Sequence, residues 1–137
     1  MSSTRTLLLP RYVVPVRPRG EVLHDHGVLV ENGRITGCWP RAEALKRAGD
    51  AERVALDTHA LIPGLVNTHT HAAMNLLRGW ADDLDLQVWL NEHIWPAERR
   101  WVGPEFVRDG SELALAEMIR GGQTCFNDNY FFPEVTA

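Results

Sequence analysis

The 137-residue sequence has few cysteines, no basic stripe and no long apolar run. Its two cysteines, Cys38 and Cys125, lie far apart and outside any CxxC pattern, which disfavours a disulfide framework or a cysteine-based zinc site, and we expect both to be small buried apolar residues. A net charge of −4 without a Lys/Arg stripe excludes nucleic acid as a default partner. No stretch approaches the roughly 18 apolar residues of a membrane span, and no signal-peptide cleavage site follows the N-terminus. These absences predict a cytoplasmic protein.

The composition, with 45% hydrophobic and 23% charged residues, is that of a globular chain. Short β-like runs dominate residues 1–60, and the clearest is GVLVENGRITGCW, where Asn32 and Gly33 suit the two positive-φ positions of a hairpin turn. The run RAEALKRA predicts a helix that Gly49 ends, and ERVALD then returns to alternation. Residues 1–60 therefore predict a small, mostly β domain.

From Leu61 the pattern changes to strand, helices and strand. The continuous apolar run LIPGLVN is typical of a strand buried on both faces, and TCFNDNYFF predicts a second such strand. Between them, DLDLQVWLNEHIWPAE has helical spacing until Pro96, and GPEFVRDGSELALAEMIRGG begins a helix at Pro104 and stops it at Gly121 and Gly122. This order predicts an α/β fold with a parallel sheet.

Two histidines follow the first of these strands in the sequence VNTHTH. Side chains two residues apart on a strand point the same way, so His69 and His71 should project together at the strand's C-terminal end. Two imidazoles that converge on one point are suited to a divalent ion such as Zn²⁺. Taken alone, the HxH pair also fits two polar residues that bond to the backbone at a strand end.

Three longer runs carry a family resemblance: PGLVNTHTHAAMNLLRGWADD, WLNEHIWPAE and AEMIRGGQTCFNDNYFF. Together they resemble the amidohydrolase superfamily, in particular its 5-methylthioadenosine/S-adenosylhomocysteine deaminases and the neighbouring triazine hydrolases. The resemblance implies that residues 1–60 are the N-terminal part of a composite β-sandwich domain. It also implies that residues 61–137 are the first two βα units of a metal-dependent (β/α)8 barrel.

The same resemblance implies roles for individual residues. His69 and His71 would be ligands of one divalent metal ion, zinc, and Asn67 stands where two-metal relatives carry Asp. The implied reaction is hydrolytic removal of an amino group from a purine nucleoside, in which the metal activates water. Glu98 would hold the ribose diol, with a solvated glutamate just past a helix end as the alternative. The family's other ligands and its acid/base residues come from later strands, so we expect no catalytic residue here.

Four tryptophans accompany Glu98: Trp80, Trp89, Trp95 and Trp101. Aromatic side chains can line a nucleobase pocket or belong to the core, and we expect Trp95 to bind substrate and Trp89, which lies in the helix's apolar stripe, to belong to the core. Asp128 could line the same pocket or cap a turn.

The remaining histidines carry weaker signals. His24, His26 and His59 are expected to be solvated on the surface, and His93, on the apolar face of its helix, to be a hydrogen-bonded core residue.

Length limits what this sequence can do alone. An α/β barrel takes about 250 residues, so we expect an N-terminal fragment that needs the remainder of the barrel, is inactive by itself, and forms a homo-oligomer when complete. The expected partner is a small, purine nucleoside-like substrate. A triazine-type or guanine-type hydrolase and a non-catalytic truncated fragment remain alternatives.

Overall fold

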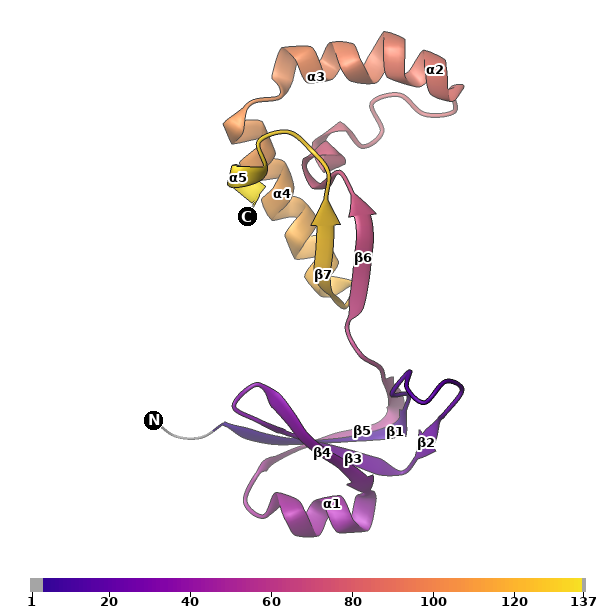
Figure 1. The fold of residues 1–137 in the computed structure, drawn as a ribbon, viewed down its shortest axis with the longest axis vertical. Helices are drawn as coiled ribbons and strands as arrows, with labels where there is room; N and C mark the ends of the chain where they lie inside the picture. The colour runs from indigo at the N-terminus through magenta and orange to yellow at the C-terminus, as the bar shows by residue number, and fades with distance from the viewer. Residues whose placement is uncertain (1–3, 137) are drawn as a thin grey trace. The chain divides into compact units, whose positions relative to one another are not determined.

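The protein is described here by a computed structural model that covers residues 4–136 and folds as two compact units, Met1–Pro63 and Gly64–Ala137 (Figure 1). Within the described residues, no helix is both long enough and apolar enough to cross a membrane.

The first unit is a five-stranded sheet with one helix. Its path is β2-β1-β3-β4, and β5 pairs in parallel with β1, while the other pairings are antiparallel. The strands are β1 (Arg5–Val13), β2 (Leu23–His24), β3 (His26–Glu31), β4 (Arg34–Pro40) and β5 (Glu52–Leu61), and the helix is α1 (Arg41–Ala48). Leu7 and Leu9 of β1 lie in the core of this unit, and β1 itself pairs with β3 and with β5.

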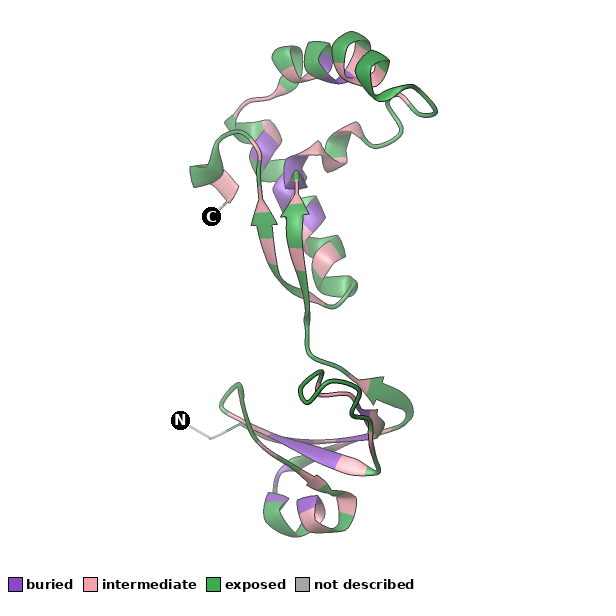
Figure 2. Ribbon diagram, turned by 45° about the vertical axis from the view of Figure 1, so that its right-hand side comes forward, coloured by how far each residue is buried: buried purple, intermediate pink, exposed green. Residues whose placement is uncertain are grey.

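The local predictions for this unit are confirmed. Asn32 and Gly33 have φ values of 50° and 77° and form the turn between β3 and β4, and α1 ends at Gly49, whose φ is 58°. The core lies between the sheet and α1, where Leu7 and Ala44 are fully buried (Figure 2). Residues 4–63 form one sheet and one helix, and the assignment of this unit to the N-terminal part of a composite β-sandwich domain stays a prediction.

The second unit is α/β, as predicted, with two parallel strands joined by helical segments. The strands are β6 (Leu65–Thr70) and β7 (Gln123–Asp128). The helical segments are η1 (Ala72–Leu77), α2 (Leu86–Val88), η2 (Trp89–Ile94), α3 (Trp95–Trp101), α4 (Pro104–Arg120) and α5 (Pro133–Thr136). Parallel strands end at the same edge of a sheet, so the residues after β6 and β7 lie next to each other.

Helix α4 begins at Pro104 and ends before Gly121 and Gly122, as predicted, and packs against η1 through small residues. A Cβ atom added at Gly110 would lie 2.5 Å from the backbone oxygen of Ala73. The backbones therefore touch at a point where only glycine fits, and this contact fixes the segment that follows His71.

Three expectations were wrong. The second unit's strands are not buried on both faces: Leu65 and Val66 are 49% and 61% exposed. The pairing of β6 with β7 joins the edges of these strands and does not cover their faces, where these side chains lie. Cys38 and Cys125 are exposed rather than buried, since Cys38 lies on the edge strand β4 and Cys125 on β7.

Pro96 does not end its helix, contrary to the prediction. The helical run continues from α2 through η2 into α3, and Pro96 lies in the first turn of α3 (Figure 1). Proline lacks an N–H and its ring clashes with the carbonyl four residues earlier in an α-helix. The preceding segment η2 is a π-helix, whose wider i→i+5 turn removes that conflict.

Candidate metal and substrate site

The rings of His69 and His71 lie together at the C-terminal end of β6. Their centroids are 5.1 Å apart and their planes meet at 80°. His69 is the second-last residue of β6, and His71 is the first residue after the strand. Because side chains two residues apart on a strand point the same way, both imidazoles lie together, as the sequence predicts. Both residues are exposed.

The orientation of His71 is set by the chain that follows β7. Its Nδ1 atom lies 2.5 Å from the carbonyl oxygen of Asn129, and because a carbonyl only accepts, Nδ1 donates. In the neutral ring the lone pair is then on Nε2, which is the form in which histidine binds a metal. The Asn129 backbone N–H in turn donates to the carbonyl of Thr70, 2.9 Å away.

Asp128 does not line the cavity, and it does not cap a turn within its own segment. Its Oδ1 atom accepts a hydrogen bond of 2.8 Å from the backbone N–H of Ala72, the first residue of η1. Asp128 therefore ties the end of β7 to the residue directly after His71. Asn67 acts nearby, where its side-chain oxygen accepts from the His69 N–H at 3.3 Å.

The two imidazoles fit part of a metal site. Catalytic zinc is commonly held by three protein ligands and water. Among the residues that the structure describes, no group of three or more His, Cys, Asp or Glu side chains is placed to hold an ion. His69 and His71 therefore offer two nitrogen ligands, and a complete site needs at least one more.

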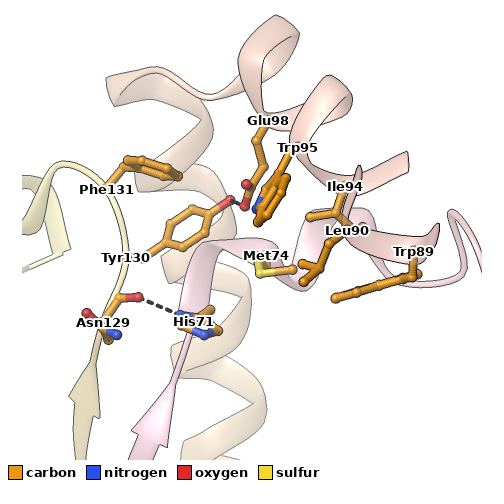
Figure 3. Close-up of a pocket in the computed structure, with 10 residues that line it drawn as sticks. All are labelled: His71, Met74, Trp89, Leu90, Ile94, Trp95, Glu98, Asn129, Tyr130 and Phe131. Carbon is orange, nitrogen blue, oxygen red and sulfur yellow. Dashed lines mark hydrogen bonds between the residues drawn. The ribbon is translucent and has the colours of Figure 1, made fainter. Parts of the chain in front are cut away.

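A cavity of about 370 Å³ adjoins His71 (Figure 3). It is lined by His71, Met74, Trp89, Leu90, Ile94, Trp95, Glu98, Asn129, Tyr130 and Phe131. Most of these side chains are apolar or aromatic, whereas His71 and Glu98 supply ionisable groups from two different elements. Such a combination is typical of sites for small molecules with a flat apolar part and a few polar groups.

The residues expected near Glu98 are placed in part as predicted. Glu98 lies within α3 rather than past a helix end, because the helix continues through Pro96. Trp95 lines the cavity, and so does Trp89, which was expected to be core. Trp80 and Trp101 are 60% and 55% exposed and do not line this cavity.

Tyr130 also lines the cavity, although it was not predicted from the sequence as a site residue. Its hydroxyl donates to Oε1 of Glu98 at 2.7 Å, and its ring centroid lies 6.0 Å from that of His71. Burial raises the pKa of the phenol well above its ordinary value, and the hydrogen bond to the Glu98 carboxylate raises it further. The phenol therefore keeps its proton and donates it in the hydrogen bond to Glu98. Its position two residues after Asp128 could have indicated a place at the strand-end rim.

The other four histidines lie outside this site. His24 and His59 are exposed, and Nδ1 of His26 lies 2.7 Å from the backbone oxygen of His24. His93 is half-buried in η2 and does not line the cavity.

Residues 60–135 match the amidohydrolase family, which is more than half of the chain. The chain belongs to the amidohydrolase family. The family prediction is thereby confirmed, and His69, His71, Glu98 and the cavity all lie within the matched region of this amidohydrolase.

Individual relatives agree with this assignment. The chain is 47% identical over 140 residues to a 5-methylthioadenosine/S-adenosylhomocysteine deaminase of Teredinibacter turnerae, and the match covers 100% of this chain and 32% of the relative. A crystal structure of a zinc-bound adenosine deaminase from Xanthomonas campestris superposes with a TM-score of 0.92 at 55% identity, covering 96% of this chain and 30% of that one. A zinc complex of atrazine chlorohydrolase from Arthrobacter aurescens has a TM-score of 0.83 at 20% identity, with 96% and 32% covered, and shares the fold.

This amidohydrolase chain thus spans about a third of the length of the relatives that it matches.

Proposed function

We propose that this chain is part of a metal-dependent hydrolase that deaminates purine nucleosides of the adenosine type. The observation that carries the proposal is the cavity that places His71 and the Glu98 carboxylate among aromatic side chains. The names of the relatives support it, because one is a 5-methylthioadenosine/S-adenosylhomocysteine deaminase and another an adenosine deaminase with bound zinc.

The proposed architecture follows the family. Residues 1–60 would be the N-terminal part of a composite β domain, and residues 61–137 the first two βα units of a (β/α)8 barrel. The remaining strands and ligands would come from further polypeptide. The proposal is supported by the parallel pairing of β6 with β7 and by the exposed faces of both strands, which further strands and helices would cover.

His69 and His71 would hold one divalent ion, zinc. When bound, such an ion lowers the pKa of water to roughly 7 and so provides a nucleophile at neutral pH. The chain's own contribution is to hold the imidazoles: the Asn129 carbonyl keeps the proton of His71 on Nδ1 and leaves Nε2 for the metal.

Glu98 would bind the sugar and Trp95 the base. A carboxylate accepts hydrogen bonds from both hydroxyls of a vicinal diol, and charge-assisted bonds of this kind are about twice as strong as neutral ones. The indole of Trp95 offers a flat apolar surface on the same side of the cavity, suited to the face of a purine. The cavity's aromatic side chains would also exclude water from the bound nucleoside.

The experiment is to assay ammonia release by a full-length protein that contains this chain. The substrates are 5′-methylthioadenosine, S-adenosylhomocysteine and adenosine, and guanine and a chlorotriazine serve as comparisons. We expect turnover of the adenosine compounds, loss of turnover after chelation, and recovery with zinc. Turnover of guanine or triazine alone would favour the alternative hydrolase classes, and no turnover of any compound would contradict an enzymatic role.

A further inference from the structure

The hydroxyl of Tyr130 connects the segment after β7 to helix α3. It donates to Oε1 of Glu98 at 2.7 Å (Figure 3), and both side chains line the cavity. Tyr130 is half-buried, and its ring packs against Phe131 with centroids 5.1 Å apart. The phenol is thus held by packing, and its proton points at one oxygen of the carboxylate.

Within the described part of the chain, one side chain holds the Glu98 carboxylate. Among residues 4–136, Tyr130 is the side chain that hydrogen-bonds to its carboxylate, and no lysine, arginine or histidine forms an ion pair with it. A glutamate has up to about 2 kcal/mol of rotamer entropy to lose on being fixed. A carboxylate that is already oriented loses less of this freedom when it binds a ligand.

The same segment also orients His71. The carbonyl of Asn129 accepts from its Nδ1, and the next residue, Tyr130, bonds to Glu98. Two consecutive residues therefore fix one group from the end of β6 and one from α3. The distance between the metal-side imidazole and the carboxylate is set by this short connection.

We propose that Tyr130 is a positioning residue for sugar recognition: it holds Oε1 of Glu98 and directs the carboxylate at the vicinal diol of the nucleoside. This role rests on the proposed function, since it takes the sugar of a nucleoside as the ligand. Tyr130 acts through Glu98 and does not touch the reacting atoms.

The test is ligand binding to the full-length zinc-loaded protein, with calorimetry as the readout. The probes are inosine and 2′,3′-dideoxyinosine, which differ in the diol and carry no amino group to remove. We expect wild type to prefer inosine and Tyr130→Phe to bind inosine about 3- to 10-fold more weakly, the effect of freeing one side chain, with dideoxyinosine unchanged. With adenosine as substrate, KM should rise more than kcat falls.

Controls separate positioning from packing. Tyr12→Phe changes the chain's other tyrosine, on β1 of the first unit, and should leave both affinities unchanged. In a Glu98→Gln background, Tyr130→Phe should add little to the loss, because both changes act on one interaction. Tyr130→Leu, which also lacks the hydroxyl, gives the same comparison if circular dichroism shows that the phenylalanine variant does not fold.

Two failures would look different. Unchanged preference for the diol in Tyr130→Phe, or equal weakening of both probes, would overturn the role of Tyr130 while ammonia release by wild type upholds the enzyme. In the opposite case, the wild type releases no ammonia and still prefers the probe with the diol, a preference that Tyr130→Phe removes. That result would overturn the deaminase proposal and uphold the positioning role.

Discussion

Backbone groups decide the state of individual site residues in this protein. The Asn129 carbonyl sets which nitrogen of His71 carries the proton, and the Ala72 N–H occupies the carboxylate of Asp128. Neither backbone group can be recognised in the sequence, because every residue has a carbonyl and nearly every residue has an N–H. The sequence could therefore name His71 and Asp128 as strand-end residues, but not choose between pocket lining and capping for Asp128.

Charge pairing gives a prediction at the same scale. Nε of Arg5 lies 2.6 Å from Oε1 of Glu31, and this hydrogen bond is the main reason that the pKa of Glu31 is held below its usual value. A lowered folded-state pKa stabilises the fold above the unfolded pKa, and this stability is lost as pH falls through the folded pKa. We expect Glu31→Gln to lower the urea midpoint slightly at pH 7 and to leave it unchanged at pH 2.

Urea denaturation of both proteins at a series of pH values measures this difference. Glu52→Gln is the matched control, since Glu52 is exposed on β5 and forms no ion pair among the described residues. An equal loss for both variants, or a loss for Glu31→Gln that persists at pH 2, would show that the ion pair with Arg5 is not the cause.

At the scale of elements, the contact between α4 and η1 holds the segment that directly follows His71. Gly110 lets the two backbones meet at Ala73, two residues after His71. Val107, Ser111 and Ala114 are buried on α4, whereas Leu113 is 43% exposed. Helical periodicity located the face approximately, whereas the depth of the contact depends on a glycine.

We expect Gly110→Ala to destabilise the protein by about 1–3 kcal/mol, despite the better helix propensity of alanine, because its Cβ would overpack the site. A Cβ 2.5 Å from the Ala73 oxygen must displace η1, and His71 precedes this segment directly. Thermal unfolding measures the stability. In the full-length protein, zinc affinity should fall as well.

Gly103→Ala is the control, because a Cβ at Gly103 meets nothing within 4 Å. The backbone φ of Gly103 is −156°, which alanine also adopts. Gly103 is also the N-cap residue of α4, where alanine is less favourable than glycine, so we expect a loss of up to about 1 kcal/mol, smaller than the loss at Gly110. If both variants were equally stable, the close contact at Gly110 would carry no energetic weight.

At the scale of the whole molecule, the described residues contain only part of a metal and substrate site. The described residues provide two imidazoles and one cavity with Glu98, but no third metal ligand among them. Leu65 and Val66 on β6 are 49% and 61% exposed in the part of the chain that the structure describes. The predicted homo-oligomer and the cytoplasmic location stay predictions.

The isolated 137-residue chain is therefore expected to bind zinc weakly and to release no ammonia from 5′-methylthioadenosine or S-adenosylhomocysteine. Two nitrogen ligands leave an ion largely to solvent, and removal of outer partners alone can cost 10–100-fold in metal affinity. Metal analysis after gel filtration, together with the ammonia assay, measures both properties. Stoichiometric zinc with turnover by this chain would show that two histidines suffice.

The sequence by itself determined the family and those elements whose ends depend on neighbouring residues. Hairpin, helix-stop and strand patterns depend on neighbouring residues, so Asn32, Gly49 and Gly121 could be placed from local chemistry alone. The HxH pair needed only the two-residue period of a strand to bring its rings together.

Only the tertiary structure decided which distant residues meet. The bond from Tyr130 to Glu98 joins positions 32 residues apart, and the π-helix before Pro96 carries Glu98 into α3. The burial of side chains also depends on the tertiary structure, because an apolar strand is covered only where other elements pack on it. Leu65 and Val66 accordingly remain exposed. Contacts of this kind depend on the folded arrangement of several elements, and no local pattern in the sequence encodes them.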